Sequence, residues 1–339
     1  MMNMSDRVSK IRHKPTFSVL LTSFFIAIVG CGGGGSSLNS ANQYKLIKTI
    51  TAHETSARST MFSPDEKILA SCGWDGSLKL WDTTTWQLKR KLQASADYLQ
   101  QLAFSPDGLL IATASNDKKI HIWDVQNETL KFSCQGHTKE VLSVTFSPNG
   151  QTIASGATDG TIRLWDRNTG QVNKVVTTPD EWVISLAYSP DGTKLISTGF
   201  NNSNLASAYR IWNASTGVLL SSHAIGTNSA SNVTFLLNQS VVALGAHFSI
   251  RLLNLDSMSQ VGFFDGHSGN IDYLQFSKDG KTLFSCAHDA TLKIWNVDTG
   301  ELKETLIGHT NAVRFLSVSS TENLIASSGD DQTIRIWKK

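Results

Sequence analysis

Residues 136–166 read GHTKEVLSVTFSPNGQTIASGATDGTIRLWD, and this stretch decides the fold. It contains a Ser-Pro-Asn-Gly turn at 147–150, where proline presets one backbone angle and glycine accepts a positive φ. Its last run, Thr161 to Trp165, alternates polar and apolar residues as a half-buried strand does. The stretch therefore predicts short antiparallel strands joined by tight turns.

The Trp-Asp dipeptide at the end of this stretch recurs along the chain. Successive copies are separated by 42, 42, 47, 83 and 42 residues. The step of 83 is nearly two periods, and a degenerate copy lies in its middle, so the chain contains seven units. The seven copies are Trp81-Asp82, Trp123-Asp124, Trp165-Asp166, Trp212-Asn213, Leu253-Asn254, Trp295-Asn296 and Trp337-Lys338.

A period of about 42 residues, with Trp-Asp endings and Gly-His beginnings, resembles the WD40 repeat, in which each unit is a four-stranded propeller blade. The Gly-His pairs lie at 136–137, 266–267 and 308–309, and Ala52-His53 stands in for another. A single blade cannot bury both of its faces, so the blades must stack. The resemblance covers residues 44–339 and implies an all-β fold, a seven-bladed β-propeller of four-stranded WD40 blades.

The two ends of the repeat region predict how the ring closes. The last unit stops at Lys339, just after its third strand, so its fourth strand is missing. Before the first unit, residues 44–50 alternate as a strand that has no blade of its own. We expect this strand to complete blade 7, which joins the first and last blades and removes an open edge.

The composition indicates a folded, nearly neutral body. Apolar residues make up 40% of the 339 residues and charged residues 17%, which is enough apolar material for a large core and too little charge for a disordered chain. The first 30 residues hold four of the 30 basic and one of the 28 acidic residues. The remaining 26 basic and 27 acidic residues nearly cancel, so nucleic acid is not expected as a partner.

The N-terminus has the pattern of an export signal. A short basic stretch at 5–14 precedes an apolar run at 16–29, which is 14 residues long. A membrane-spanning helix needs about 20 residues, so the run fits the apolar region of a secretory signal peptide. The next residues, Ile28-Val29-Gly30-Cys31, resemble the lipobox of bacterial lipoproteins. The resemblance implies that the preceding peptide is removed and that Cys31 is lipidated.

Three segments follow from this interpretation. Residues 1–30 are a removed lipoprotein signal peptide, 31–43 are the lipidated cysteine with a Gly/Ser tether, and 44–339 are the propeller. Gly32 and Gly33 follow the cysteine in place of aspartate, which by the same resemblance favours an outer membrane, facing the periplasm, in a Gram-negative source. Multiple acyl chains make such an anchor stable. The alternatives are an ordinary signal peptide followed by a chance cysteine and a retained anchor helix.

The remaining cysteines, Cys72, Cys134 and Cys286, are odd in number. Three thiols cannot all pair within one chain, and Cys72 and Cys286 take nearly equivalent positions in blades 1 and 6, which are not neighbours. We expect all three to be small buried residues without disulfides.

Four units carry His, Ser, Asp and Trp at constant spacing. A Ser-His-Asp set invites a nucleophilic interpretation. Four copies, each with a tryptophan, instead resemble the structural hydrogen-bond tetrad of WD40 blades, in which the hydroxyl is buried and saturated. Blades 2, 4 and 5 depart from the pattern, with Ser95, Pro179 and Gly226 at the histidine position and Leu253 at one tryptophan position. The four sets are His53, Ser71, Asp75 and Trp81; His137, Ser155, Asp159 and Trp165; His267, Ser285, Asp289 and Trp295; and His309, Ser327, Asp331 and Trp337.

The resemblance also places a partner-binding face. In WD40 proteins partners usually meet the face that carries the start of each innermost strand and the turn between the second and third strands. On this face we expect three aromatic residues on one rim, beside charged residues at the mouth of the channel. Aromatic rings with arginine nearby are typical of interaction hot spots, although rings that pack between blades would give the same pattern. The candidate residues are Trp74, Tyr98, Trp182, Arg58, Asp272, Arg314 and His288.

The sequence favours a non-enzymatic scaffold that binds a protein or peptide at the cell envelope, acts as a monomer and needs no cofactor. One alternative is a small-ligand or glycan binder at the channel mouth, served by Arg58, Asp272 and Arg314. A second is a propeller enzyme, which the lack of an unassigned catalytic cluster disfavours. His247 and His288 fall on equivalent turns of adjacent blades, but no third metal ligand is evident, so no metal site is expected.

Overall fold

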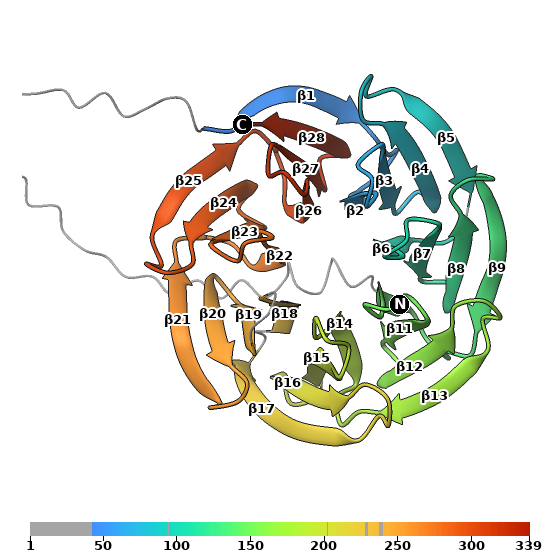
Figure 1. Ribbon diagram of the computed structural model, residues 1–339, viewed down its shortest axis with the longest axis vertical. Coiled ribbons are helices and arrows are strands. Elements are labelled where there is room, and N and C mark those ends of the chain that lie inside the picture. Colours follow the sequence, from blue (N-terminus) through green and yellow to red (C-terminus); the bar gives the residue numbers. More distant parts are fainter. Residues whose placement is uncertain (1–42, 94, 202, 228–229, 237–239) are drawn as a thin grey trace, which may run out of the picture. The chain divides into compact units, whose positions relative to one another are not determined.

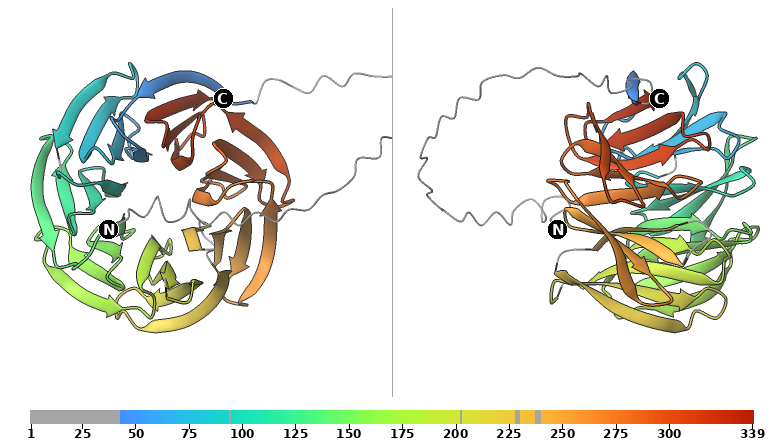
Figure 2. Two further views of the ribbon diagram at one scale, coloured as in Figure 1. Left: turned by 180° about the vertical axis from the view of Figure 1, so that it is seen from behind. Right: turned by 60° about the vertical axis from the view of Figure 1, so that its left-hand side comes forward.

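The chain folds into seven four-stranded antiparallel sheets that follow one another around a central channel (Figure 1). The computed structural model describes residues 43–339 apart from 94, 202, 228–229 and 237–239, so the expected signal peptide at 1–30 and Cys31 lie outside the described residues. All the described elements are strands. Figure 2 shows the same ring from behind and from the side. The expected all-β, seven-bladed propeller is confirmed.

Blades 1 to 4 are built in chain order from the inside outward. Their strands are β2 (Ala57–Phe62), β3 (Ile68–Gly73), β4 (Ser77–Asp82) and β5 (Leu88–Gln93); β6 (Leu99–Phe104), β7 (Leu110–Ser115), β8 (Lys119–Asp124) and β9 (Thr129–Gln135); β10 (Val141–Phe146), β11 (Thr152–Ala157), β12 (Thr161–Asp166) and β13 (Val172–Thr177); and β14 (Trp182–Tyr188), β15 (Lys194–Asn201), β16 (Ala206–Asn213) and β17 (Leu219–Thr227).

Blades 5 and 6 repeat this order, whereas blade 7 takes its outer strand from the segment that precedes blade 1 in the sequence. The strands are β18 (Ala230–Phe235), β19 (Val241–Ala246), β20 (Ser249–Asn254) and β21 (Ser259–Asp265); β22 (Ile271–Phe276), β23 (Thr282–Ala287), β24 (Thr291–Asn296) and β25 (Leu302–Ile307); and β26 (Val313–Val318), β27 (Leu324–Gly329), β28 (Thr333–Lys338) and β1 (Lys45–Thr51).

Burial differs between the inner and outer strands of a blade. β3 is buried along nearly its whole length, because a sheet lies against each of its faces, while β5 has one partly buried side chain and is otherwise exposed. Sheets that are covered on both sides read as continuous apolar runs, and sheets with a solvated edge read as alternating ones. The apolar β7 and the mixed β9 follow the same rule.

The ring is closed by β1, which pairs antiparallel with β28, as the sequence predicts. Ile50 lies opposite Ile334 in this pair and is buried. Tyr44, just before β1, donates a hydrogen bond of 2.5 Å from its hydroxyl to the carbonyl oxygen of Glu322. Its ring meets the edge of Phe284 at 6.4 Å between centres, so Tyr44 contacts blade 6 as well as blade 7.

Neighbouring blades are joined by a repeated apolar contact. The contact is made by one residue of each outer strand, which is the cross-strand neighbour of the residue three before the repeat tryptophan. In blade 1, for example, Leu92 on β5 lies opposite Leu78 on β4. This outer-strand residue points toward the next blade. At six junctions this residue shares an apolar cluster with the tryptophan of that next blade. The six pairs are Ile50 with Trp81, Leu92 with Trp123, Cys134 with Trp165, Val176 with Trp212, Phe264 with Trp295 and Leu306 with Trp337.

Blades 4 and 5 meet differently. By register, the outer-strand position is taken by His223, which lies opposite Tyr209. The tryptophan position is taken by Leu253. This junction therefore lacks the ring that the other six share.

Deletion of residues 44–50 tests the closure. We expect the midpoint of thermal unfolding to fall by about 10 °C or more, because the deletion exposes Ile334 and the edge of β28, and each 1 kcal/mol corresponds to about 2–4 °C in a chain of this size. Scanning calorimetry gives the midpoint. Deletion of residues 32–37 is the control and should leave it unchanged; equal midpoints for both deletions would disprove closure by β1.

Candidate functional site

The Ser-His-Asp sets form closed hydrogen-bond chains inside four blades. In blade 3, the Trp165 indole donates to Ser155 Oγ at 2.8 Å, and the His137 ring lies 2.7 Å from the same Oγ and 3.0 Å from Asp159. A carboxylate only accepts, so His137 Nδ1 donates to Asp159 and Nε2 accepts from the serine hydroxyl. Blades 1, 6 and 7 repeat this chain with His53, Ser71, Asp75 and Trp81; His267, Ser285, Asp289 and Trp295; and His309, Ser327, Asp331 and Trp337.

Burial sets the protonation of these chains. It lowers the pKa of His137, against the opposing hydrogen bond to Asp159. Burial alone would raise the pKa of Asp159, but hydrogen bonds from His137 and Thr161 hold it well below its usual value. Ser155 is fully buried and already bonded on both sides, so its hydroxyl is not accessible to a substrate. The tetrads therefore stabilise the blades and do not form catalytic triads.

Blade 2 replaces the missing histidine from another strand. Ser95 takes the histidine position in the sequence, but His121 on β8 lies 3.0 Å from Asp117 and 2.8 Å from Ser133. Trp123 still donates to a hydroxyl, that of Thr113, at 3.1 Å. The sequence analysis missed His121, although one signal was available. The residue two before the repeat tryptophan position is Lys or Arg in the other six units and His only here.

Blade 4 replaces the histidine with a buried ion pair. Pro179 takes the histidine position, and the next residue, Asp180, pairs with Arg210 of β16. Both side chains are buried. Trp212 keeps its bond to the strand hydroxyl, donating to Ser197 at 2.9 Å. The sequence analysis missed this pair because Asp180 lies one residue outside the expected register.

At the channel mouth, Arg314 of β26 links charges from two blades. Its Nε donates to Asp330 at 2.9 Å, and its Nη2 bonds the same carboxylate. Its Nη1 donates to Asp272 of blade 6 at 3.1 Å, and Asp272 also lies 3.1 Å from His288. Ser56, just before β2, donates to Asp330 at 2.5 Å. The structure therefore brings Asp272, His288 and Arg314 together and adds Asp330 and Ser56 to them.

Beside this cluster, three of the candidate residues form a stack. The guanidinium carbon of Arg58 lies 5.0 Å from the centre of the Trp74 ring. Trp74 stacks on Tyr98 of blade 2, with 5.1 Å between ring centres and 19° between planes. The Trp74 indole donates to Gln100 at 3.3 Å, and Gln100 donates to Asn116 at 2.8 Å. All three stacked side chains are half-buried, so the stack joins blades 1 and 2 and still reaches solvent.

The positive charges of Arg314 and Arg58 are neutralised to different extents by nearby carboxylates. Burial alone would lower the pKa of Arg314, but Asp272 and Asp330 raise it. Burial first, and then the charge of Arg314, lower the pKa of Arg58 to about 10. Arg58 Nε is buried without a hydrogen-bond partner among the described residues. Arg58 is therefore less fully neutralised than Arg314.

Trp182 lies apart from the other two aromatic residues. Its ring packs against Phe200, its cross-strand neighbour in blade 4, at 5.4 Å between centres. Trp74 and Tyr98 belong to blades 1 and 2, on another side of the ring (Figure 1). The three expected rim aromatics therefore form two separate groups. Trp74 and Tyr98 stack between blades 1 and 2, and Trp182 packs on Phe200 within blade 4.

The described residues also bear on the other candidate chemistry. Cys72, Cys134 and Cys286 are buried free thiols. The described part of the chain contains no group of three His, Cys, Asp or Glu side chains arranged to hold a metal ion. It also contains no helix long and apolar enough to span a bilayer. Cys31 lies outside the residues that the structure describes.

Comparison with known proteins identifies the class. Residues 28–292 match the family described as "IFT122 first beta-propeller", and residues 300–338 match the "WD domain, G-beta repeat". The protein is therefore a WD-repeat β-propeller. The chain belongs to the IFT122 first beta-propeller family.

Individual relatives match over single stretches. WD repeat-containing protein 36 of Homo sapiens is 31% identical over 93 residues, which cover 27% of this chain and 10% of that protein. Target of rapamycin complex subunit wat1 of Schizosaccharomyces pombe is 24% identical over 105 residues, or 30% and 32% of the two chains. DDB1- and CUL4-associated factor 13 of Dictyostelium discoideum is 34% identical over 82 residues, or 24% and 18%. The matches thus span a third or less of these relatives.

The buried histidines predict a pH dependence of stability. Burial lowers the pKa of His53, His137 and His309, so the folded state binds fewer protons than the unfolded state below about pH 6.5. Their contribution is complete above that pH and is lost as the pH falls. The tetrad carboxyls, with lowered pKa values, act in the same direction below about pH 4.

We expect the midpoint of thermal unfolding to be level between pH 7 and 8 and to fall steadily from about pH 6.5 to 5. In NMR titrations, the imidazole protons of these three residues should titrate at lower pH than those of free histidine. A midpoint that rises on acidification to pH 5 would contradict the assignment of neutral buried imidazoles.

Proposed function

We propose that this propeller is a non-enzymatic scaffold that binds a protein or peptide through the mouth of its channel. The observation that carries the proposal is the stack of Arg58, Trp74 and Tyr98 beside the charged cluster around Arg314. Aromatic rings and arginine dominate the binding energy of protein interfaces, above all where they are partly desolvated. The names of two relatives, a complex subunit and an associated factor, support the same role.

The charges of the mouth indicate what part of a partner it takes. Arg314 is held by two carboxylates, while Arg58 makes no ion pair with any carboxylate among the residues that the structure describes. A partner that inserts an acidic side chain would pair with Arg58, while an apolar neighbour packs on Trp74 and Tyr98. The protein acts as a monomer in this proposal, because β1 supplies the fourth strand of blade 7 from the same chain and each blade is then a four-stranded sheet.

The same proposal places the scaffold at the cell envelope. A basic stretch, a short apolar run and Ile28-Val29-Gly30-Cys31 occur in the order of a bacterial lipoprotein signal. A lipid on Cys31 and the Gly/Ser segment at 32–37 would tether the propeller to a membrane, the outer membrane facing the periplasm in a Gram-negative source.

Alanine at the stack tests partner binding. Proximity labelling of the full chain in its source cells identifies a partner, whose affinity for the purified variants is then measured by calorimetry. Trp74→Ala, and separately Tyr98→Ala, should weaken binding at least about tenfold, because each removes a ring from the centre of the contact. Each variant is checked for an unchanged unfolding midpoint.

Phe263→Ala is the matched control, because this ring is 50% exposed on the outer strand of blade 5. It should leave affinity unchanged. Equal losses for Phe263→Ala and Trp74→Ala would rule out the channel mouth. Binding of a small ligand or glycan, with no protein partner, would establish the alternative function.

Cys31→Ala tests the anchor. The wild-type protein should enter the detergent phase on Triton X-114 separation and carry the mass of its acyl chains, since several buried chains give stable membrane association. Cys31→Ala should remain in the aqueous phase, while the control Ser36→Ala should behave as wild type. A mature wild-type protein without lipid mass would exclude lipidation.

A further inference from the structure

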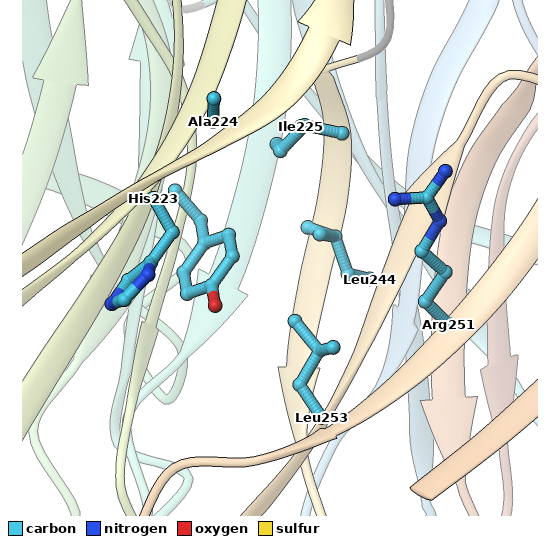
Figure 3. A pocket seen from close by; sticks show the side chains of 7 residues that line it. His223, Ala224, Ile225, Leu244, Arg251 and Leu253 are labelled. Atoms are coloured by element: carbon cyan, nitrogen blue, oxygen red, sulfur yellow. The ribbon is translucent and has the colours of Figure 1, made fainter. Parts of the chain in front are cut away.

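A pocket of about 220 Å³ lies between blades 4 and 5, and none of its lining residues belongs to the stack of Arg58, Trp74 and Tyr98 (Figure 3). Strands β16 and β17 form one wall, and β19 and β20 form the other. Its apolar surface comes from Ile225, Leu244 and Leu253. Its polar groups come from Tyr209, His223 and Arg251.

The pocket exists because this junction lacks its tryptophan. Between blades 5 and 6, Phe264 meets Trp295 edge to face, with 5.8 Å between ring centres. Between blades 4 and 5, the same two positions hold His223 and Leu253. Both side chains are smaller than those they replace. When a large side chain is replaced by a smaller one, the surroundings relax only partly and a cavity remains. The other six junctions fix the spacing of the blades, so the space at this junction stays open.

One wall of the pocket carries a buried ring nitrogen with no hydrogen-bond partner among the described residues. The Tyr209 and His223 rings stack as cross-strand neighbours, with 4.9 Å between centres and 18° between planes. His223 Nε2 is buried and has no hydrogen-bond partner among the described residues. Burial raises the pKa of Tyr209, so its hydroxyl stays protonated and able to donate. Buried polar groups are nearly always bonded, so a hydrogen-bonding group of a ligand would complete this wall.

The opposite wall carries an arginine that has lost its carboxylate (Figure 3). The position two before the repeat tryptophan is Lys or Arg in six blades and His in blade 2, and in blades 1 and 7 an aspartate four residues earlier pairs with the cation. Lys79 lies 3.6 Å from Asp75, and Arg335 lies 3.7 Å from Asp331. In blade 5 the turn position of that aspartate is His247, and Arg251 makes no ion pair with any described residue.

We propose that this pocket binds a small organic acid that has an apolar body and a hydroxyl group at the end opposite its carboxylate. The carboxylate takes the place of the missing aspartate and pairs with the Arg251 guanidinium, whose geometry suits bidentate binding. The body packs on Leu244 and Leu253, which lie between His223 and Arg251 in Figure 3. The hydroxyl bonds with Tyr209 and His223.

The size of the pocket limits this ligand to about ten non-hydrogen atoms, since a cavity of about 150 Å³ holds benzene. The charge of Arg251 excludes cations, and the apolar wall disfavours fully hydroxylated sugars. The site is independent of the partner-binding stack, so the two proposals fail or succeed separately.

Calorimetric titration of the full chain with 4-hydroxybenzoate, benzoate and phenol tests the proposal. We expect 4-hydroxybenzoate to bind most tightly, benzoate several-fold more weakly because it lacks the hydroxyl, and phenol not measurably because it lacks the carboxylate. Arg251→Gln should weaken 4-hydroxybenzoate at least tenfold. Leu253→Trp should restore the missing ring, fill the pocket and abolish binding.

Arg163→Gln is the matched control, because Arg163 holds the position of Arg251 in blade 3, where its guanidinium lies 6.0 Å from the intact Trp165 ring. It should bind 4-hydroxybenzoate as the wild type does. No heat of binding with any of the three compounds would overturn the proposal. So would equal affinity of the wild type and Arg251→Gln, a result that does not depend on whether Leu253→Trp folds.

Discussion

The repeat tryptophan holds the propeller together in two directions at once. Within its blade, its indole nitrogen donates to the hydroxyl of the second strand, as Trp165 does to Ser155 at 2.8 Å. Between blades, its ring packs on the outer strand of the preceding blade, as Trp295 does on Phe264. A blade cannot bury its faces alone, so this contact is what converts seven sheets into a ring. The indole of this tryptophan takes part in the tetrad, its side chain packs on the closing strand in blade 1, and the pocket lies at the junction where it is missing.

Much of the fold was predictable from the sequence, because it depends on spacing. The period of about 42 residues set the blade count, and the unmatched strand before the first blade predicted the pairing of β1 with β28. The compensations in the degenerate blades were not predictable in this way. His121 comes from a strand and Asp180 from one residue outside the register, and each reaches its partner only through the three-dimensional packing of the blade.

The candidate site shows the same limit. Register predicted that Arg58, Asp272 and Arg314 face the channel, and in the structure Arg314 donates to Asp272 while Arg58 interacts electrostatically with both. It could not show which of them neutralise one another, because two carboxylates converge on Arg314 and leave Arg58 against an aromatic ring. Trp182 was grouped with Trp74 by position, but cross-strand pairing places it on Phe200. The position of a residue within its repeat predicts which face of the propeller it lies on, but its contacts on that face depend on how its side chain packs.

The strand that closes the ring is also the part of the propeller that follows directly on the N-terminal segment. Any pulling force transmitted along the chain from that side reaches Tyr44 first and then β1. β1 is an outer strand bonded along one side only, so such a load would peel it from β28 one hydrogen bond at a time. Just before β1, the Tyr44 hydroxyl donates a hydrogen bond to the carbonyl oxygen of Glu322, and its backbone nitrogen donates one to the Glu304 carboxylate. Under such a load these two hydrogen bonds would have to break before β1 could separate from β28.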